Sequence, residues 1–198
     1  MRIFSTTLAL VALLPAALAG QARYSATFGL TGGTRLVRDR IFQTIDVTQA
    51  LAPTVTVGAS LPVSAHERAG LEVSLGFGKT RIEETGLPTV DGPAFRTLSV
   101  VGGVDGPLLG PLTYHGGAGI MKYLPDKEGI FRQGGPTLLL LSGGVNYHLP
   151  MHGAIGLVAK LRYDYQRFST NQLTATGFAR TQDVHRVGLG LGIEYQRP

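Results

Sequence analysis

The chain has 198 residues, 28 of them glycine, with a formal net charge of +5 and an isoelectric point near 9.7. It has no cysteine, which excludes disulfides, thiolate metal sites and cysteine nucleophiles. The arginines are scattered, with no basic helix and no interleaving of basic and aromatic residues, so the positive charge does not indicate nucleic-acid binding.

The N-terminus has the pattern of a secretory signal peptide. A short basic start precedes an apolar run over residues 8–18 and the small-x-small pattern Ala17-Leu18-Ala19. The run is shorter than the roughly 18 apolar residues of a spanning helix, which argues against an N-terminal anchor. We expect cleavage after residue 19, with cleavage after Ala22 as the alternative, and a single mature domain over residues 20–198.

The mature sequence alternates between apolar residues and polar residues or glycine, which is the period of a β-strand. The alternation is clearest over residues 155–168, where Leu157 and Leu161 share one face while Lys160 and Arg162 share the other. It is equally clear over residues 187–195. Six earlier segments have the same period: residues 24–34, 54–63, 71–83, 94–104, 112–124 and 136–149.

These eight segments are long enough to cross a bilayer at a tilt, which takes about 9–11 residues per strand. We therefore predict an all-β fold, an eight-stranded antiparallel up-and-down transmembrane β-barrel, whose interior is narrow and filled by side chains. The apolar face would contact lipid and the charged face would line the lumen. Two segments are less regular, because Val101 interrupts the alternation and residues 138–141 are apolar on both faces.

The connections alternate in length. Residues 64–70, 105–111 and 150–153 have the Pro, Gly and Asp content of short turns. The longer, more polar connections are residues 35–53, 84–93, 125–135 and 169–182. Bacterial outer-membrane barrels place short turns in the periplasm and long loops outside, so both termini would be periplasmic.

Aromatic side chains fall near both ends of the predicted strands, as interface girdles do. The expected girdle residues are Tyr24, Tyr114, Tyr147 and Tyr195 at the periplasmic ends, and Phe77, Tyr163 and Tyr165 at the external ends. The outer girdle is thin, because the chain lacks Trp and Tyr123 has the opposite parity from Tyr114. A general preference of tyrosine for strands is the alternative explanation.

With its signal peptide, eight alternating strands and connections of alternating length, the chain resembles the small outer-membrane barrels. These are typified by the transmembrane domain of outer-membrane protein A and by outer-membrane protein X. That family carries an assembly signal in its last strand, and Gly190, Ile193 and Tyr195 match its spacing. The chain departs from it at Gly188, where a polar residue is usual, and in the trailing Gln196-Arg197-Pro198. The resemblance implies the architecture and brings no catalytic motif with it.

The charged face carries six residues that should meet inside the lumen: Glu72, Lys160, Arg162, Asp164, Arg186 and Glu194. Isolated charges there would be costly, so we expect the three cations to pair with the three acids. Inward glycines would make room for these long side chains. The network could act as a plug or as a gate, and we favour the plug because the interior of a small barrel is full.

Catalytic and metal sites are not indicated. The histidines lack ligand spacing beside a carboxylate, and we interpret them as surface residues. The glycines of residues 188–192 lie in a strand with no helix after it, so they do not form a nucleotide loop. Some eight-stranded barrels modify lipid A, and Ser169, Asp183 and His185 lie near the external edge. The His-x-Ser motif of the deacylases is absent, so we expect no enzyme activity and no cofactor.

The sequence therefore predicts an exported outer-membrane protein with a role in envelope integrity or surface contact. A small-solute or ion pore is the alternative, ahead of a lipid A-modifying enzyme or a soluble lipocalin-like binder, which would expose a glycine-rich face to water. Expected partners are outer-membrane lipids, lipopolysaccharide and the outer-membrane assembly machinery. Arg81 and Lys122 are candidate lipopolysaccharide contacts, with an ordinary solvated surface as the alternative because acids interleave with the bases there.

Overall fold

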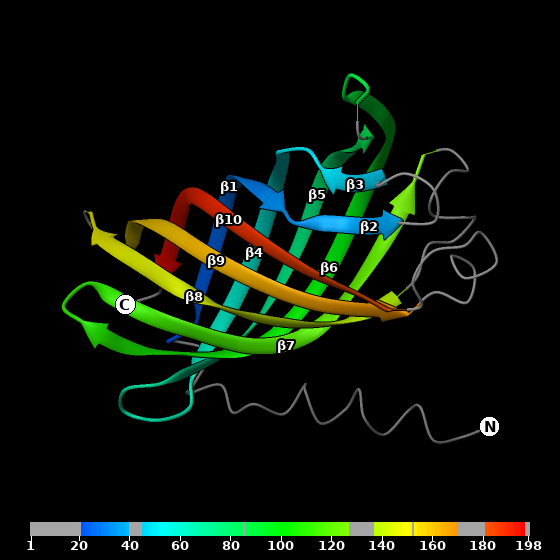
Figure 1. The fold of residues 1–198 in the computed structure, drawn as a ribbon. Coiled ribbons are helices and arrows are strands. Elements are labelled where there is room, and N and C mark those ends of the chain that lie inside the picture. The colour runs from blue at the N-terminus through cyan, green and yellow to red at the C-terminus, as the bar shows by residue number, and fades with distance from the viewer. Residues whose placement is uncertain are drawn as a thin grey trace.

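The computed structural model describes residues 21–39, 45–84, 86–126, 137–151, 153–169 and 181–196. Within these residues, no helix is long and apolar enough to cross a bilayer. The same residues form ten strands (Figure 1): β1 (Arg23–Gly33), β2 (Arg35–Asp39), β3 (Ile45–Gln49), β4 (Ala52–Pro62), β5 (Arg68–Glu84), β6 (Val90–Leu109), β7 (Leu112–Pro125), β8 (Thr137–Pro150), β9 (Ile155–Ser169) and β10 (Thr181–Gln196). The expected signal peptide lies outside the described residues.

Eight of these strands close into an antiparallel ring in the order β5-β4-β1-β10-β9-β8-β7-β6, and β6 pairs back with β5. The first strand, β1, pairs with the last strand, β10, with Tyr24 opposite Tyr195. Closure pairs the backbone groups of each ring strand on both sides, as a bilayer requires. The predicted eight-stranded, up-and-down β-barrel is confirmed.

Strands β2 and β3 correct the prediction that residues 35–53 form a loop. They form a hairpin that prolongs β1 and β4, and β3 pairs with the end of β5. Backbone bonds continue through both junctions, from Thr34 N to His185 O at 2.8 Å and from Ala50 N to Lys79 O at 3.0 Å. The hairpin forms because Leu36 and Val47 are buried inward and because β3 supplies hydrogen-bond partners to the long strand β5.

The two ends of the barrel differ. At the end that we call the turn end, residues 63–67, 110–111 and 151–154 connect the strands, and the first two turns are shorter than predicted because β5 and β6 extend further. Gly110 and Gly153 have φ angles of 54° and 70°, a region that glycine tolerates. At the opposite end, the loop end, the strand ends flank residues 40–44, 85–89, 126–136 and 170–180.

The outer surface carries the aliphatic face predicted for β9 and β10. The exposed aliphatic residues on these strands are Ile155, Leu157, Leu161, Val187, Leu189, Leu191 and Ile193. Their polar neighbours in sequence point inward, and Asp164 and Arg186 are buried. The assignment of the apolar face to the outside and the charged face to the inside is therefore confirmed for these strands.

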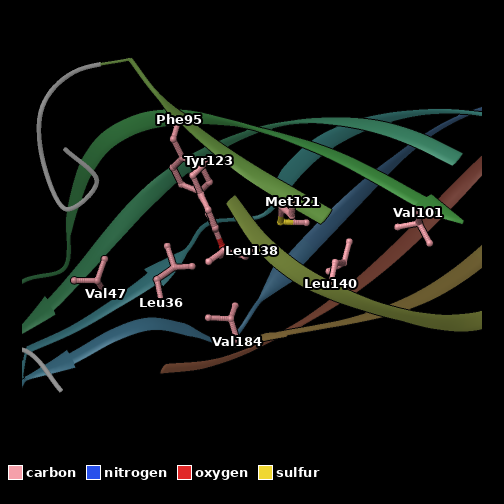
Figure 2. Close-up of a cluster of buried hydrophobic side chains, with 9 residues drawn as sticks. All are labelled: Leu36, Val47, Phe95, Val101, Met121, Tyr123, Leu138, Leu140 and Val184. Carbon is pink, nitrogen blue, oxygen red and sulfur yellow. The ribbon is translucent and has the colours of Figure 1, made fainter. Parts of the chain in front are cut away.

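The inside is not uniformly polar. A buried apolar cluster extends toward the loop end and consists of Leu36, Val47, Phe95, Val101, Met121, Tyr123, Leu138, Leu140 and Val184 (Figure 2). It explains the irregular segments of the sequence, since Val101, Leu138 and Leu140 point inward while Leu139 and Leu141 point outward. Phe95 and Tyr123 stack at a ring-centroid distance of 5.7 Å.

Candidate functional site in the barrel interior

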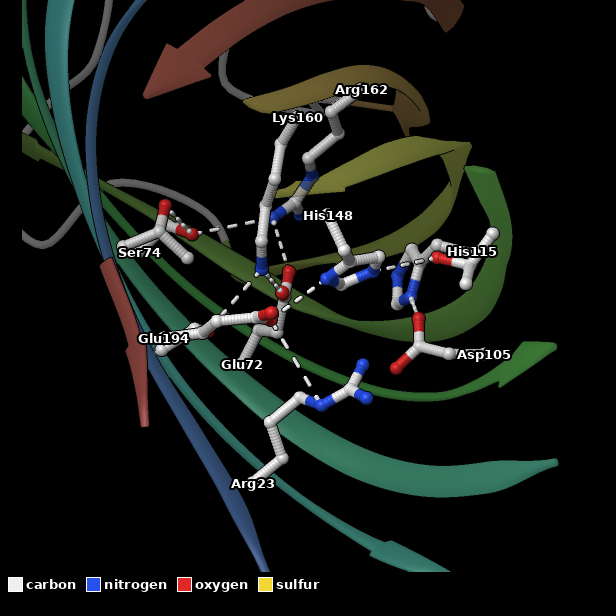
Figure 3. A network of polar contacts seen from close by, with 12 residues as sticks. Arg23, Glu72, Ser74, Asp105, His115, His148, Lys160, Arg162 and Glu194 are labelled. Atoms are coloured by element: carbon white, nitrogen blue, oxygen red, sulfur yellow. Dashed lines mark hydrogen bonds and ion pairs between the residues drawn. The ribbon is translucent and has the colours of Figure 1, made fainter. Parts of the chain in front are cut away.

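Charged side chains from opposite walls meet inside the barrel. Lys160 on β9 binds Glu72 on β5, and Nη1 of Arg162 lies 3.4 Å from the other oxygen of Glu72 (Figure 3). Three ring strands separate β5 from β9, so these contacts cross the interior. All three side chains are largely buried.

Arg162 is the most connected of these residues. Its Nε donates to Asp164 Oδ1 at 2.7 Å, and its Nη1 also donates to the hydroxyl of Ser74 at 3.3 Å. Arg162 and Asp164 are two residues apart on β9 and therefore share the inward face. The network thus joins two acids on different strands through one guanidinium.

A second group of contacts lies nearer the turn end and includes two histidines. His148 Nδ1 is 2.7 Å from Glu194 Oε2, and His115 Nδ1 is 2.8 Å from Asp105 Oδ1 (Figure 3). Arg23 Nε lies 3.9 Å from Glu194. The interpretation of His115 and His148 as surface residues is wrong, because they alternate with outward residues and so face the lumen.

Arg186 does not make the ion pair expected of it. Asp164 lies directly opposite on β9 but turns along its own strand to Arg162. Instead Arg186 Nη2 donates to the hydroxyl of Tyr123 at 2.6 Å, its Nη1 lies 3.2 Å from the sulfur of Met121, and its guanidinium is 5.2 Å from the Tyr123 ring centroid. Within the described residues, no carboxylate is in ion-pair contact with Arg186.

Glycines on neighbouring strands make room for these long side chains. Gly58 lies opposite Glu72 and Gly156 lies opposite Glu194. A Cβ atom on Gly58 would be 3.3 Å from Cγ of Glu72, and one on Gly156 would be 3.0 Å from Oε1 of Glu194. Side chains at these positions would press on the acids of the network.

Two cavities remain between the side chains, with volumes of about 60 Å³ and 30 Å³. The larger is lined by Arg162, Asp164 and Arg186, and the smaller by His148 and Glu194. Glu72 and Lys160 line both cavities. Their ion pair therefore forms part of the boundary between the two spaces.

The residues considered for catalysis do not form a triad in the described part of the chain. His185 Nδ1 is 2.5 Å from the hydroxyl of Tyr163, and Asp183 accepts a bond of 2.8 Å from Tyr165. The acid and the imidazole thus each bind a tyrosine, while the side chain of Ser169 lies outside the described residues. The described residues also contain no group of three His, Cys, Asp or Glu side chains able to hold a metal.

No family model matches the sequence, and no curated protein matches it. Solved structures do match. OprG of Pseudomonas aeruginosa, an outer membrane protein, has a TM-score of 0.54 at 9% identity, covering 89% of this chain and 96% of OprG. For Neisserial surface protein A the values are 0.51 at 15% identity, with coverage of 88% and 96%. Ail of Yersinia pestis, in complex with the heparin analogue sucrose octasulfate, has a TM-score of 0.50 at 16% identity, covering 88% of this chain and 99% of Ail. The chain has the fold of the small outer-membrane β-barrels.

The outer wall of this barrel carries the aromatic residues expected at the interfaces. Tyr24, Tyr114, Tyr147 and Tyr195 are exposed near the turn end, and Phe77 and Tyr163 are exposed toward the loop end. Tyr165 is half-buried there. In β10, Ile193 and Tyr195 of the expected assembly signal point outward, while Gly190 lines the larger cavity.

The two candidate lipopolysaccharide contacts lie on the outer wall as well. Arg81 on β5 and Lys122 on β7 are exposed and near the loop end. Arg96 on β6 lies between these strands, where its guanidinium forms an exposed ion pair of 3.1 Å with Asp126. The bases therefore lie on the outer wall near the loop end, with acids among them.

Proposed function

We propose that this protein is an integral barrel of the bacterial outer membrane whose lumen is plugged, and that it acts in envelope integrity or surface contact without catalysing a reaction. The contact that carries the proposal is the meeting of Lys160 and Arg162 with Glu72 across the interior. Behind it, the apolar cluster occupies the loop end. Ions would have to displace buried pairs and then cross an apolar segment, which is costly.

The outer surface supports the proposed location. Leu191 is 66% exposed and Leu189 is 61% exposed, and a wall of such residues is stable in lipid but not in water. The predicted signal peptide would export the chain. Heat-modifiable migration of protein extracted from purified outer membranes tests both the location and the closed fold, and recovery from the soluble fraction would contradict them.

Planar-bilayer recording tests the plug. We expect the purified wild-type barrel to conduct poorly at every voltage, and we expect the same of a Lys122→Ala variant, which changes only the outer wall. Large and steady wild-type conductance would overturn the plug.

That result would support the second candidate function, a small-solute or ion pore. The observation that favours a pore is the pair of cavities bordered by Glu72 and Lys160. If that ion pair opens, the two spaces join.

Surface contact is proposed for the loop end because the outward bases lie there. The matched structure of Ail holds a sulfated sugar analogue, and we propose that polyanionic headgroups of lipopolysaccharide are the corresponding neighbours of Arg81 and Lys122. Arg makes forked bonds to such oxygens. The assembly machinery of the outer membrane is the partner that we propose for the β10 signal.

A further inference from the structure

The larger internal cavity has features that the plug does not explain. Its volume of about 60 Å³ exceeds the roughly 10–15 Å³ that one water needs. Strands from several sides turn hydroxyl groups toward it. The hydroxyl residues that line it are Thr27, Thr31, Thr54, Thr56, Ser74, Thr97 and Ser99.

The charges around this cavity do not balance. Three cations line it, Lys160, Arg162 and Arg186, against two carboxylates, Glu72 and Asp164. Both carboxylates are already bound by Lys160 or Arg162. One positive charge is left over among largely buried side chains, where an uncompensated charge is costly.

That charge is on Arg186, whose side chain is unusual for a buried cation. The residue is 3% exposed, and its bonding partners are a phenol and a thioether, both uncharged. Among the residues that the structure describes, Nε of Arg186 has no hydrogen-bond partner, and neither does Nη2 of Arg162. The buried guanidinium of Arg186 and the largely buried one of Arg162 line one cavity and thus each retain an unpartnered N–H.

The two arginines are close neighbours on the inner wall. Arg162 lies opposite Gly188, and Arg186 lies two residues from Gly188 on β10, so the pair is diagonal on one face. Gly188 and Gly190 contribute no side chains, which leaves the space beside the guanidinium groups open. The cavity also carries acceptors, the carboxylates of Glu72 and Asp164 and the side-chain oxygen of Gln49. An anion would therefore lie on the side of the two guanidinium groups.

We propose that this cavity binds one small monovalent anion of the halide class, held by Arg186 and Arg162 and by the surrounding hydroxyls. A single negative charge matches the excess of three cations over two acids. The cavity volume excludes larger organic acids, and a metal cation would face the free N–H groups. The site does not require a plugged lumen, because Arg186 and Arg162 would hold the anion through their own unpartnered N–H groups.

Diffraction with bromide tests the site in the wild-type protein. The barrel is refolded and crystallised in sodium bromide, with sodium gluconate as the control, and data are collected at the bromine absorption edge. We expect an anomalous peak in the cavity within hydrogen-bond distance of Arg186. Water alone at this position in bromide would overturn the proposal.

Thermal unfolding in lipid vesicles gives a second measurement at constant ionic strength. Replacing gluconate with bromide should raise the Tm of the wild type in a saturable way, because a ligand that binds only the folded state stabilises it. Arg186→Gln should lose this rise, and Arg96→Gln, on the outer wall, should keep it. An equal rise in Arg186→Gln would overturn the proposal, and if that variant does not fold, the bromide peak decides.

Discussion

Nδ1 of His148 lies 2.7 Å from Oε2 of Glu194, although the two residues are not on neighbouring strands. Strand β9 lies between β8 and β10, and its residue opposite Glu194 is Gly156. The contact passes over that glycine, so a missing side chain on one strand lets the two flanking strands bond to each other. This relationship ties three consecutive ring strands together at the turn end.

Glu194→Gln should destabilise the barrel by about 1–3 kcal/mol, because His148 and Arg23 lose their charged acceptor while staying partly buried. Urea unfolding in lipid vesicles measures the change. The matched control is Glu67→Gln, in the exposed turn 63–67, which should stay within about 0.5 kcal/mol of wild type. Equal effects of the two variants would mean that the interior contact adds no stability.

Leu191→Arg should destabilise the barrel by about 2–4 kcal/mol, because this outward residue would place a charge near the bilayer midplane. Leu161→Arg, an exposed residue near the middle of β9 and opposite Leu189, should have a similar effect. Leu149→Arg, near the turn end of β8, should cost only about 0–1 kcal/mol, since the cost falls toward the interface. The measurement is equilibrium unfolding in lipid, and a neutral Leu191→Arg would show that the lipid-facing wall is assigned wrongly.

Gly78→Ala should destabilise by about 1–3 kcal/mol through overpacking. Its Cβ would be 2.9 Å from the ring of Phe95, and that ring is packed on Tyr123 within the apolar cluster. Gly116→Ala is the control, because nothing lies within 4 Å of its new Cβ and its effect should be within about 0.5 kcal/mol. Unfolding midpoints of the two variants in the same vesicles give the comparison.

The two faces of β9 and β10 could be predicted because alternation is local: once Leu157 points outward, Lys160 and Arg162 must point inward. The same parity gave enough information to place His148 inside, since it follows Tyr147, which faces outward. The error lay in treating strand ends as surface. In a barrel, parity and not distance from the strand end decides which side chains face the lumen.

The partner of Arg186 and the apolar cluster could not be predicted in this way. Arg186 on β10 meets Tyr123 on β7, and those strands are separated by β8 and β9, so the contact depends on strand tilt and stagger. Residues 138–141 did signal apolar residues on both faces. The sequence did not show what the inward ones pack against, because Leu140 and Val101 meet in one cluster only once the barrel is closed.

Replacing Arg81 and Lys122 together with alanine should weaken binding of lipopolysaccharide to the barrel by up to about tenfold, as expected from the loss of two exposed charge contacts. The loss should shrink at high salt. Glu83→Gln with Asp91→Asn removes exposed acids from the same region and should strengthen binding. Titration of lipopolysaccharide into the barrel in detergent measures both, and unchanged affinity in both variants would indicate an ordinary solvated surface.

Arg162→Ala should act on stability and on conductance together. It leaves Asp164 without its 2.7 Å partner and takes one of two cations from Glu72, and breaking a buried pair on one side costs roughly 3–5 kcal/mol. The plug should then leak, because the remaining Lys160–Glu72 contact is the only described ion pair left across this part of the interior.

The matched control for this variant is Arg167→Ala on the same strand. Arg167 pairs with Asp183 at 3.4 Å on the exposed surface, where such a pair contributes about 0–1 kcal/mol, so this variant should stay near wild type and should not leak. Unfolding curves and planar-bilayer recordings on the same preparations compare the two. A leak without loss of stability in Arg162→Ala would indicate a gate that opens without cost, and an Arg162→Ala barrel unchanged in both assays would show that these ion pairs neither stabilise nor close the lumen.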